Sequence, residues 1–532
     1  MEDKKLFWGD FHKHLQDLDD PDRIIKSARD NIDFYPLLCY PFVWFLQSST
    51  GEKEYLGQPT NLSDAFPEAE ESSRLLVEST GHRSEYDLWW KKIKKKVRQY
   101  NDPGNFVTLL GYEWHGNRRR YGDNNVIYFG DEGELDPEEK LPDLYANHKG
   151  ERTLIIPHHI GYKRGRRGKD WDVFDEKLSP VAEIFSYHGS SETEPGLRSL
   201  NNNPSMGPGV SESLWQEGLD RGYRVGAIAS NDGPGLPGGY GNGLAAIWAD
   251  SLTRKSLYES LMDRRVYAVT GDKIELSYYV NGEPMGSVLS NEDRVEVDFS
   301  ARAPSALDRV ELILNGERVR VYEHLEKSPV IKEDRFAVRV DFGWGPATHY
   351  GISEEGLDWK GELAVSDGIL EDVNTCFTIV GQKLDWSSKC ARWQLSSRRQ
   401  GNELNSELRQ SIIFKLKGGP KTELYFQGNG YKFSRKIKDL AEGSDLIALE
   451  DRARELVERD TSISAEKVMN PDVFYFISPK IKLHKASGGA ERRAEGSFTV
   501  KDELKPGRNY LYLRVLEKNG QMAWSSPIWI DR

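Results

Sequence analysis

The sequence contains few cysteines and no long hydrophobic segment. Its three cysteines, Cys39, Cys376 and Cys390, have neither CxxC spacing nor the pattern of a disulfide framework, which favours a reducing compartment. No apolar run approaches the roughly 18 residues that are needed to cross a bilayer, and the first residues lack the apolar stretch of a secretion signal. We therefore expect a cytoplasmic protein without a membrane partner, although an exported protein trimmed of its leader would look the same.

An excess of positive charge is also absent. The 532 residues include 73 Lys and Arg against 85 Asp and Glu, which gives a formal net charge of −12. Because dedicated nucleic-acid binders carry a basic surface, no nucleic-acid partner is expected. The aromatic content of 11% excludes a disordered chain, and the length indicates more than one domain.

The first half of the chain alternates short apolar runs with helical patterns, which is typical of α/β proteins. Eight of the eleven histidines also lie in the first 188 residues, so we expect the chemistry in this half. The predicted strands are Leu6–His14, Phe106–Trp114, Asn125–Phe129, Thr153–His159, Val181–His188, Val225–Ser230 and Leu244–Ala249. The predicted helices are Pro21–Asn31, Glu85–Tyr100 and Ser251–Arg265.

The pattern changes after about residue 271, where apolar and polar residues alternate with period two between Gly, Asn and Pro turns. This alternation predicts an antiparallel β-sandwich. The pairs Asn281-Gly282 and Asn315-Gly316 indicate hairpins. We thus expect a catalytic domain over 1–270 and a β-sandwich over 271–532, with a charged, partly helical insertion near 395–465.

Metal-competent side chains stand near the ends of the predicted strands. His12 and His14 are two residues apart, so in a strand both would point to one face and could share a metal ion. In (β/α) barrels, catalytic groups gather at the C-terminal ends of the strands. A mixed set of histidines and carboxylates suits Zn²⁺, Mn²⁺ or Fe²⁺ rather than Ca²⁺. The other strand-end groups are Glu113, His158, His159, Glu183, His188, Asn231 and Asp232.

These motifs resemble those of the PHP (polymerase and histidinol phosphatase) superfamily, and more narrowly its DUF3604 branch. The resemblance runs in order through WGDFHKH, GYEWHG, IIPHHIGY, VAEIFSYHGSSE and RVGAIASNDGPGLPG. It implies a distorted (β/α)₇ barrel that holds two or three metal ions at its mouth. It also implies hydrolysis of phosphate esters by metal-activated water.

The resemblance assigns metal-ligand roles by position. His12 and His14 match the family's HxH, Glu113 matches its bridging glutamate, and His158 is favoured over His159 for the later histidine. The further matches are Asp19, five residues after the second histidine, and His188 with Glu192 in the branch-specific HGxSE element.

Several ligand positions depart from the family's pattern. Tyr40 and Asp123 each stand where the family has a histidine. Asn231 replaces an aspartate, for which Asp232 could substitute by a shift of one residue, and Gly233 replaces another histidine. We keep Asp123 and Asn231 as candidate ligands, and we expect one or two ions, Mn²⁺ or Zn²⁺, rather than three.

The leading functional hypothesis is a metal-dependent hydrolase for an anionic substrate, with a phosphate ester as the first choice. Arg118–Arg120 and Arg164–Arg167 would form an anion-binding rim, or else are solvated loop charges. Tyr40 is either a packed aromatic or a proton donor and acceptor. We therefore take Tyr40, His159, Arg118 and Arg164 as candidate catalytic residues.

Two other functions remain open. One is a carbohydrate-active enzyme, a polysaccharide lyase or hydrolase, in which a metal neutralises the carboxylate of an acidic polysaccharide. Tyr40 or His159 would then perform the acid–base work. The other is a degenerate, non-catalytic binding protein. The expected partner is an anionic small molecule or polysaccharide.

Overall fold

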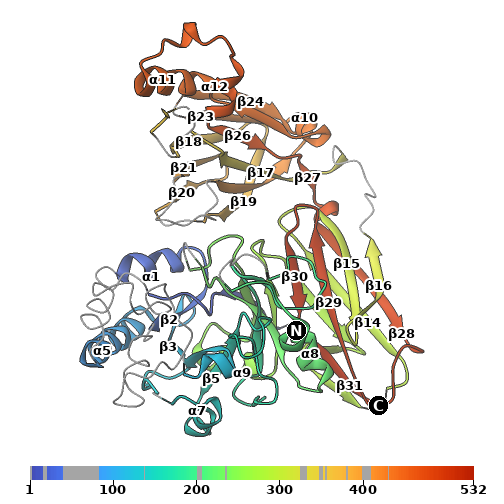
Figure 1. The fold of residues 1–532 in the computed structure, drawn as a ribbon. Helices are drawn as coiled ribbons and strands as arrows, with labels where there is room; N and C mark the ends of the chain where they lie inside the picture. The colour runs from blue at the N-terminus through green and yellow to red at the C-terminus, as the bar shows by residue number, and fades with distance from the viewer. Residues whose placement is uncertain are drawn as a thin grey trace.

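A computed structural model describes most of the chain (Figure 1). Tyr40 and Asp19, both predicted to belong to the site, lie outside the described residues. The residues that the structure describes are 3–15, 21–39, 83–114, 116–136, 138–200, 206–233, 237–290, 292–323, 332–346, 351–353, 356–378, 381–397, 409–428 and 430–532.

The N-terminal half contributes to one large mixed sheet. Strands β1, β2 and β3 pair in parallel, β4 pairs antiparallel with both β3 and β5, and β9 pairs antiparallel with β1. Only residues 115–122 separate β3 from β4, which is too short for the crossover that a parallel pair requires. The bounds are β1 Lys5–Gly9, β2 Phe34–Cys39, β3 Val107–Trp114, β4 Asp123–Tyr128, β5 Thr153–His158 and β9 Leu244–Ala249.

A second, smaller sheet of this half lies next to the large one. Strands β6 and β8 pair in parallel, and β6 also pairs with the two-residue β7. β6 lies beside β5, and β8 lies beside β10. The chain is therefore a mixed α/β protein, and the predicted ring of seven parallel strands is not confirmed. The bounds are β6 Val181–Ser186, β7 Gly189–Ser190, β8 Gly226–Ala229 and β10 Val266–Val269.

Helices occur close to the predicted positions. In α9 the Thr253 side chain accepts a hydrogen bond from the Ser256 N–H, which satisfies a free donor of the first turn. The same helix buries Leu257 and Leu261. The helices of this half are α1 Pro21–Arg29, α5 Arg83–Tyr100, α6 Arg118–Tyr121, α7 Leu141–Asn147, α8 Trp215–Asp220 and α9 Arg254–Met262, with a short 3₁₀ turn at Ser211–Ser213.

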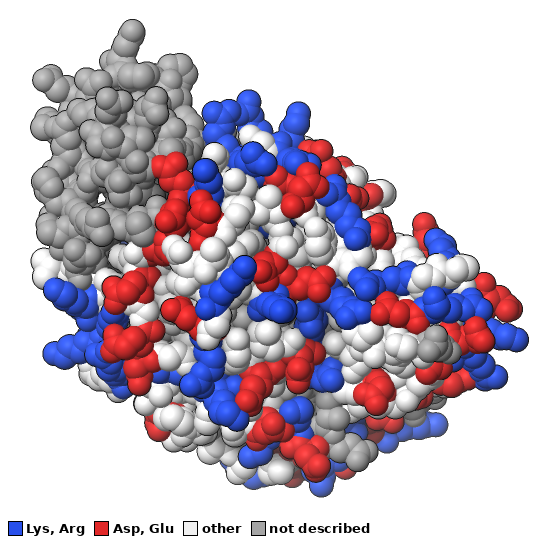
Figure 2. Space-filling view, turned by 90° about the horizontal axis from the view of Figure 1, so that it is seen from below, with Lys and Arg blue, Asp and Glu red and all other residues white. Residues whose placement is uncertain are grey.

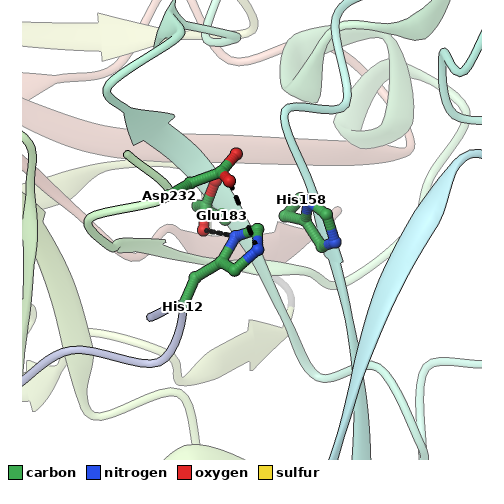
Figure 3. Close-up of side chains that lie close together, drawn as sticks. All are labelled: His12, His158, Glu183 and Asp232. Atoms are coloured by element: carbon green, nitrogen blue, oxygen red, sulfur yellow. Dashed lines mark hydrogen bonds and ion pairs between the residues drawn. The ribbon is translucent and has the colours of Figure 1, made fainter. Parts of the chain in front are cut away.

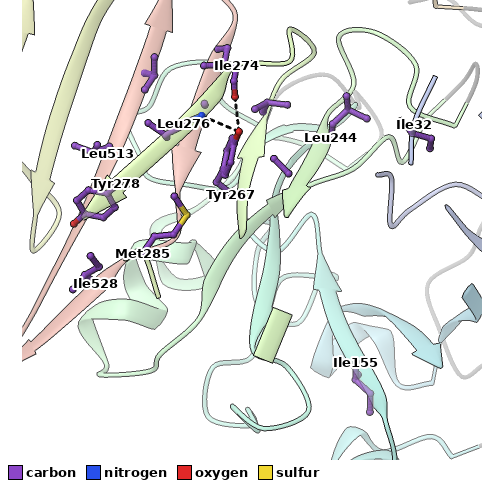
Figure 4. Packing of buried hydrophobic residues seen from close by; sticks show 14 of the residues in the cluster. Ile32, Ile155, Leu244, Tyr267, Ile274, Leu276, Tyr278, Met285, Leu513 and Ile528 are labelled. Atoms are coloured by element: carbon purple, nitrogen blue, oxygen red, sulfur yellow. Dashed lines mark hydrogen bonds between the residues drawn. The ribbon is translucent and has the colours of Figure 1, made fainter. Parts of the chain in front are cut away.

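The C-terminal strands return to the large sheet. β30 pairs antiparallel with β10, and β29 pairs with β15, β30 and β31. A four-stranded sheet, β12-β11-β14-β28, packs on this extension through buried side chains such as Leu276, Tyr278, Leu513 and Ile528 (Figure 4). The bounds are β11 Glu275–Val280, β12 Glu283–Pro284, β13 Val288–Ser290, β14 Val295–Arg302, β15 Leu307–Leu314, β16 Glu317–Glu323, β28 Arg493–Val500, β29 Arg508–Glu517, β30 Met522–Ser525 and β31 Ile528–Asp531.

The hairpin signals lie where the sequence predicts them. Asn281 and Gly282 connect β11 to β12 with φ of 50° and 82°, and Asn315 and Gly316 connect β15 to β16 with φ of 49° and 80°. Both central residues of a type I′ turn need positive φ, which explains the Asn-Gly pairs.

Residues 335–488 form a unit with its own core, which we call the inserted module (upper part of Figure 1). A six-stranded and a five-stranded sheet share this core. The segment predicted as a charged insertion, 395–465, lies within it. Its strands are β17 Arg335–Gly343, β18 Asp358–Val365, β19 Gly368–Cys376, β20 Lys383–Trp386, β21 Cys390–Ser396, β22 Gln410–Gly418, β23 Glu423–Gly428, β24 Tyr431–Lys436, β25 Asp445–Ala448, β26 Lys480–Leu483 and β27 Ser487–Gly488; its helices are α10 Ile437–Glu442, α11 Glu450–Thr461 and α12 Asp472–Ile477.

Among the described residues, no helix is long and apolar enough to span a membrane. Acidic and basic side chains are interspersed over the face that Figure 2 displays.

Lys169 is a buried amine whose charge the fold disfavours. Its Nζ donates to the Val173 carbonyl at 2.9 Å, and burial lowers its pKa to about 7. Since the unfolded lysine keeps a pKa near 10.4, the unfolded chain binds more protons between these values, and stability from this group rises with pH. Lys169→Met is therefore expected to raise the unfolding temperature at pH 7 and to lose much of this advantage at pH 9.

Thermal unfolding at both pH values tests this expectation, with the exposed Lys177→Met as the matched control. An equal gain for Lys169→Met at pH 7 and pH 9 would show that the buried amine does not titrate in this range.

Candidate metal centre

A buried aspartate fixes the backbone around the HxH motif. The sequence predicted a strand through His14, but β1 ends at Gly9, and His12 and His14 lie in the segment that follows. The carboxylate of Asp10 accepts the backbone N–H groups of His12 at 3.0 Å, Asn231 at 3.0 Å and Gly238 at 2.8 Å. Loop contacts, rather than strand pleating, therefore position the two histidines.

The central cluster combines His12, His158, Glu183 and Asp232 (Figure 3). His12 Nδ1 lies 3.1 Å from Glu183 Oε2, and His12 Nε2 lies 3.3 Å from Asp232 Oδ1. The ring centroids of His12 and His158 are 4.0 Å apart. The four ligand atoms lie within 4.8 Å of one another, so they could share one cation.

Two further groups share residues with this cluster. His12, His14 and Glu113 form one, in which His14 Nε2 and Glu113 Oε2 are in direct contact. His159, His188 and Asp232 form the other, in which His188 Nε2 lies 3.3 Å from Asp232 Oδ2. Because His12 and Asp232 each belong to two groups, the three groups form one continuous site.

The electrostatics of the site favour a bound cation. Burial lowers the pKa of His158 and His188 well below the usual value, and it also lowers the pKa of His159, so these rings are neutral and keep a lone pair. Burial raises the pKa of Asp232 well above its ordinary value, against the effect of His12. Three largely buried carboxylates, Glu113, Glu183 and Asp232, converge here. Against the effect of burial, Asp232 and Glu183 raise the pKa of His12 well above its usual value, so the site favours positive charge.

Unpartnered ring nitrogens support the same conclusion. Both nitrogens of His158 and Nδ1 of His159 are buried without a hydrogen-bond partner in the described part of the chain. Buried polar atoms are normally paired, whereas neutral imidazole nitrogens are metal ligands. The donor set therefore fits a divalent metal ion, whose identity the arrangement leaves open.

Asp123 and Arg118 are paired with each other in the structure. The sequence suggested Asp123 as a metal ligand and Arg118 as part of an anion-binding rim. In the structure Arg118 Nε and Nη2 each donate to Asp123 at 2.7 Å, and Arg167 also contacts this carboxylate. Arg118 is only 1% exposed. The two guanidinium groups hold Asp123, and its pKa lies well below the usual range despite burial.

His159, predicted as an acid–base group, lies between this ion-pair network and the metal ligands. Its Nε2 is 3.2 Å from Asp123 Oδ2 and 3.4 Å from Arg167 Nη2. The backbone φ of His159 is 34°, and that of Asp232 is 43°, which are strained values for residues with a side chain. Such strain is found where the surroundings fix a functional side chain.

Asn231 directly precedes Asp232, which belongs to two of the three ligand groups. The side-chain oxygen of Asn231 accepts the N–H of Gly233 at 3.0 Å, and the neighbouring Asp232 supplies the carboxylate. The shift of the ligand role by one residue, from Asn231 to Asp232, stays a prediction.

These neighbours provide a matched test. Asp232→Asn removes a charge that two groups share, so it is expected to weaken metal binding at least about 10- to 100-fold. Asn231→Asp keeps the acceptor for Gly233, and we expect it to retain the metal. Metal titration followed by calorimetry checks both variants, and an equal loss in the two would contradict this assignment.

Arg164 lies at the surface beside the site. Its guanidinium pairs with Asp172 at 2.6 Å and Asp170 at 3.1 Å. Together with Arg119 and Arg120 it lines an open cavity of about 440 Å³. These three arginines are the members of the predicted rim that line this cavity.

Tyr162 and Asp10 are site residues that the sequence analysis missed, and Glu183 was named there as a strand-end group but was not selected as a ligand. Glu183 is an acid within the otherwise apolar, fully buried strand β6, and a charge inside such a run was the available signal. Tyr162 O–H lies 2.6 Å from His188 Nδ1 and orients that ring. No sequence pattern distinguishes Tyr162 or Asp10 from ordinary loop residues.

Comparison with known proteins gives a family match without a known activity. A family described as a protein of unknown function (DUF3604) matches residues 46–149 and 237–305. An uncharacterised protein of Chlamydia pneumoniae is 28% identical over 257 residues, which cover 44% of this chain and 40% of that protein. An uncharacterised protein of Chlamydia muridarum is 25% identical over 260 residues, with the same two shares. The matched region thus spans two fifths of the length of these relatives.

One solved structure is similar over most of the chain. It is a two-domain protein of Bacteroides vulgatus containing a predicted PHP-like metal-dependent phosphoesterase, with 10% identity, 82% of this chain covered and 96% of that chain covered. The TM-score is 0.30, which is too low to establish a shared fold.

Proposed function

We propose that the protein is a metal-dependent hydrolase for anionic substrates, with phosphate esters as the first choice. The observation that carries this proposal is the convergence of three ligand groups through His12 and Asp232. Overlapping groups of histidines and carboxylates are the donor sets of hydrolytic metal centres.

The residues that would hold the ion are those of the three groups, and Mn²⁺ or Zn²⁺ suits their nitrogen and oxygen atoms. A divalent ion bound there supplies Lewis-acid polarisation of the scissile group and lowers the pKa of water. Asp123, held by Arg118 and Arg167, keeps His159 in place. Tyr162 fixes the orientation of His188 through Nδ1 and leaves Nε2 directed at Asp232.

The arginine-lined cavity supports an anionic substrate. Arg119, Arg120 and Arg164 stand against the single acid Asp170 among its lining residues. Guanidinium groups bind phosphate and carboxylate with two parallel hydrogen bonds, so this surface would bind an anion. His159 contacts Asp123 and Arg167 and does not line this cavity, so no specific observation favours the polysaccharide-lyase alternative.

The test is hydrolysis of p-nitrophenyl phosphate and bis-p-nitrophenyl phosphate by the full chain. We expect turnover with added Mn²⁺ or Zn²⁺, loss of turnover after chelation, and recovery when the ion is returned. Arg120→Gln is expected to raise KM more than it lowers kcat, because the Arg120 side chain would bind the anion without touching the metal-ligand groups. Turnover that survives chelation, or no turnover with either ester and either ion, would contradict the proposal.

A further inference from the structure

A second cavity lies between the N-terminal half and the inserted module, on the side of α1 and β20. Its volume is about 580 Å³. Asn31 and Lys273 line it from one side, and Asn374, Thr375 and Trp386 line it from the other. Ligand sites occur preferentially at such boundaries between structural units.

Hydrogen bonds hold the two walls in register. Thr375 Oγ1 donates to Asn31 Oδ1 at 3.2 Å across the cavity. Within the wall of Asn31, Lys273 Nζ donates to the Asn31 carbonyl at 2.7 Å. At the inner end, the Tyr240 N–H donates to the Phe377 carbonyl at 3.0 Å, and the Arg339 guanidinium stacks on the Tyr240 ring at 4.9 Å. The cavity is therefore a formed feature of the fold and is not a gap between loosely apposed surfaces.

The charged residues that line this second cavity do not suit an anionic ligand of the kind proposed for the arginine-lined cavity. Asp30, Asp272 and Asp385 face the cavity together with only two basic residues, Lys273 and Lys383. Lys273 is already bonded to Asn31. A ligand that suits these walls is neutral, because neither sign of charge is in large excess.

Two side chains indicate what kind of neutral ligand the cavity takes. Trp386 is 45% exposed at the end of β20, although a tryptophan usually buries most of its ring. Asn374 Oδ1 is a buried acceptor that has no hydrogen-bond partner among the described residues. A sugar ring offers both complements, an apolar C–H face for the indole and hydroxyl donors for the amide oxygen.

We propose that this cavity is a binding site for a neutral oligosaccharide, with Trp386 as the stacking platform and Asn374 as a hydroxyl acceptor. The site is separate from the metal centre and does not depend on the hydrolase activity proposed above. It would hold a glycan chain or a glycosylated molecule at the junction of the inserted module.

Isothermal titration calorimetry of the full chain tests the proposal with cellohexaose, xylohexaose and mannohexaose, and with hexagalacturonate as an acidic comparison. We expect at least one neutral hexasaccharide to bind, and to bind more tightly than hexagalacturonate. Trp386→Ala is expected to weaken this binding about ten-fold or more, as truncation of a central aromatic does. Asn374→Ala is expected to weaken it as well.

Tyr425→Ala is the matched control, because Tyr425 is 46% exposed and lies on β23 of the same module outside the cavity lining. It should bind like the unaltered chain, and unchanged unfolding temperatures would show that all three variants fold. Binding should also persist after chelation. Absence of binding by all three neutral sugars, or equal affinity in Trp386→Ala and the unaltered chain, would overturn the proposal.

Discussion

Replacing His12 with alanine is expected to lower kcat/KM for phosphate ester hydrolysis by about a thousand-fold or more. His12 contacts Glu113, Glu183 and Asp232, and it belongs to two of the three ligand groups. Changes in residues that only support metal ligands already cost about 10- to 100-fold in affinity or activity, so loss of a shared ligand should cost more. Steady-state kinetics with bis-p-nitrophenyl phosphate measures the effect.

His148→Gln is the control for this experiment. His148 is also largely buried and pairs with Glu151 at 3.0 Å, but it lies outside the ligand groups. It should keep the activity within a few-fold, because nothing in the site contacts it. Comparable losses in His148→Gln and His12→Ala would indicate general destabilisation and would remove the support for a special role of His12.

Replacing Asp123 with alanine is expected to destabilise the protein by about 3–5 kcal/mol, the usual cost of leaving a buried charge without its partner. Arg118 is 1% exposed and its two nitrogens bond to Asp123, so the variant would bury an uncompensated guanidinium. Arg167 and His159 would lose the same partner. Denaturant unfolding of the variant measures the change.

Glu362→Gln is the matched comparison for Asp123→Ala. Glu362 pairs with Arg392 at 3.0 Å on an exposed surface of the inserted module. Surface ion pairs contribute about 0–1 kcal/mol, so this variant should unfold close to the unaltered chain. If both variants unfolded alike, the buried ion pair would not be a stabilising element of the site.

Local patterns predicted the elements that deliver the ligands. β3 and β5 begin and end within one residue of the predicted bounds, because each is a compact apolar run that ends in a polar side chain. Glu113 and His158 therefore come from the expected places. Both lie at the ends of strands, where the chain leaves the sheet.

Strand β2 was absent from the predicted strands, and it contains Pro36, a residue that normally argues against a strand inside a sheet. The structure accommodates it because the pairing on the side of β1 is interrupted around Pro36: it joins Gly9 to Phe34 and returns only as a single bridge between His14 and Leu38. Whether a neighbouring strand diverges is a tertiary property that the local sequence does not contain.

Long-range contacts account for the other differences between the structure expected from the sequence and the observed one. Arg118 and Asp123 are five residues apart, but Arg167 is 44 residues from Asp123, and only the fold shows that all three are paired instead of facing substrate. Likewise Tyr267 pairs with Ser525, although the whole inserted module lies between these two residues in the sequence. Alternation with period two predicts strands in this region, but it does not say which sheet each strand joins.

Elemental analysis of the full chain, purified without chelators, tests the central claim most directly. The account predicts about one or two divalent transition-metal ions per chain, and a large loss of this metal in His12→Ala while His148→Gln retains it. A metal-free unaltered chain that also fails to take up Mn²⁺ or Zn²⁺ would contradict it. So would a His12→Ala variant that holds its metal at the original stoichiometry.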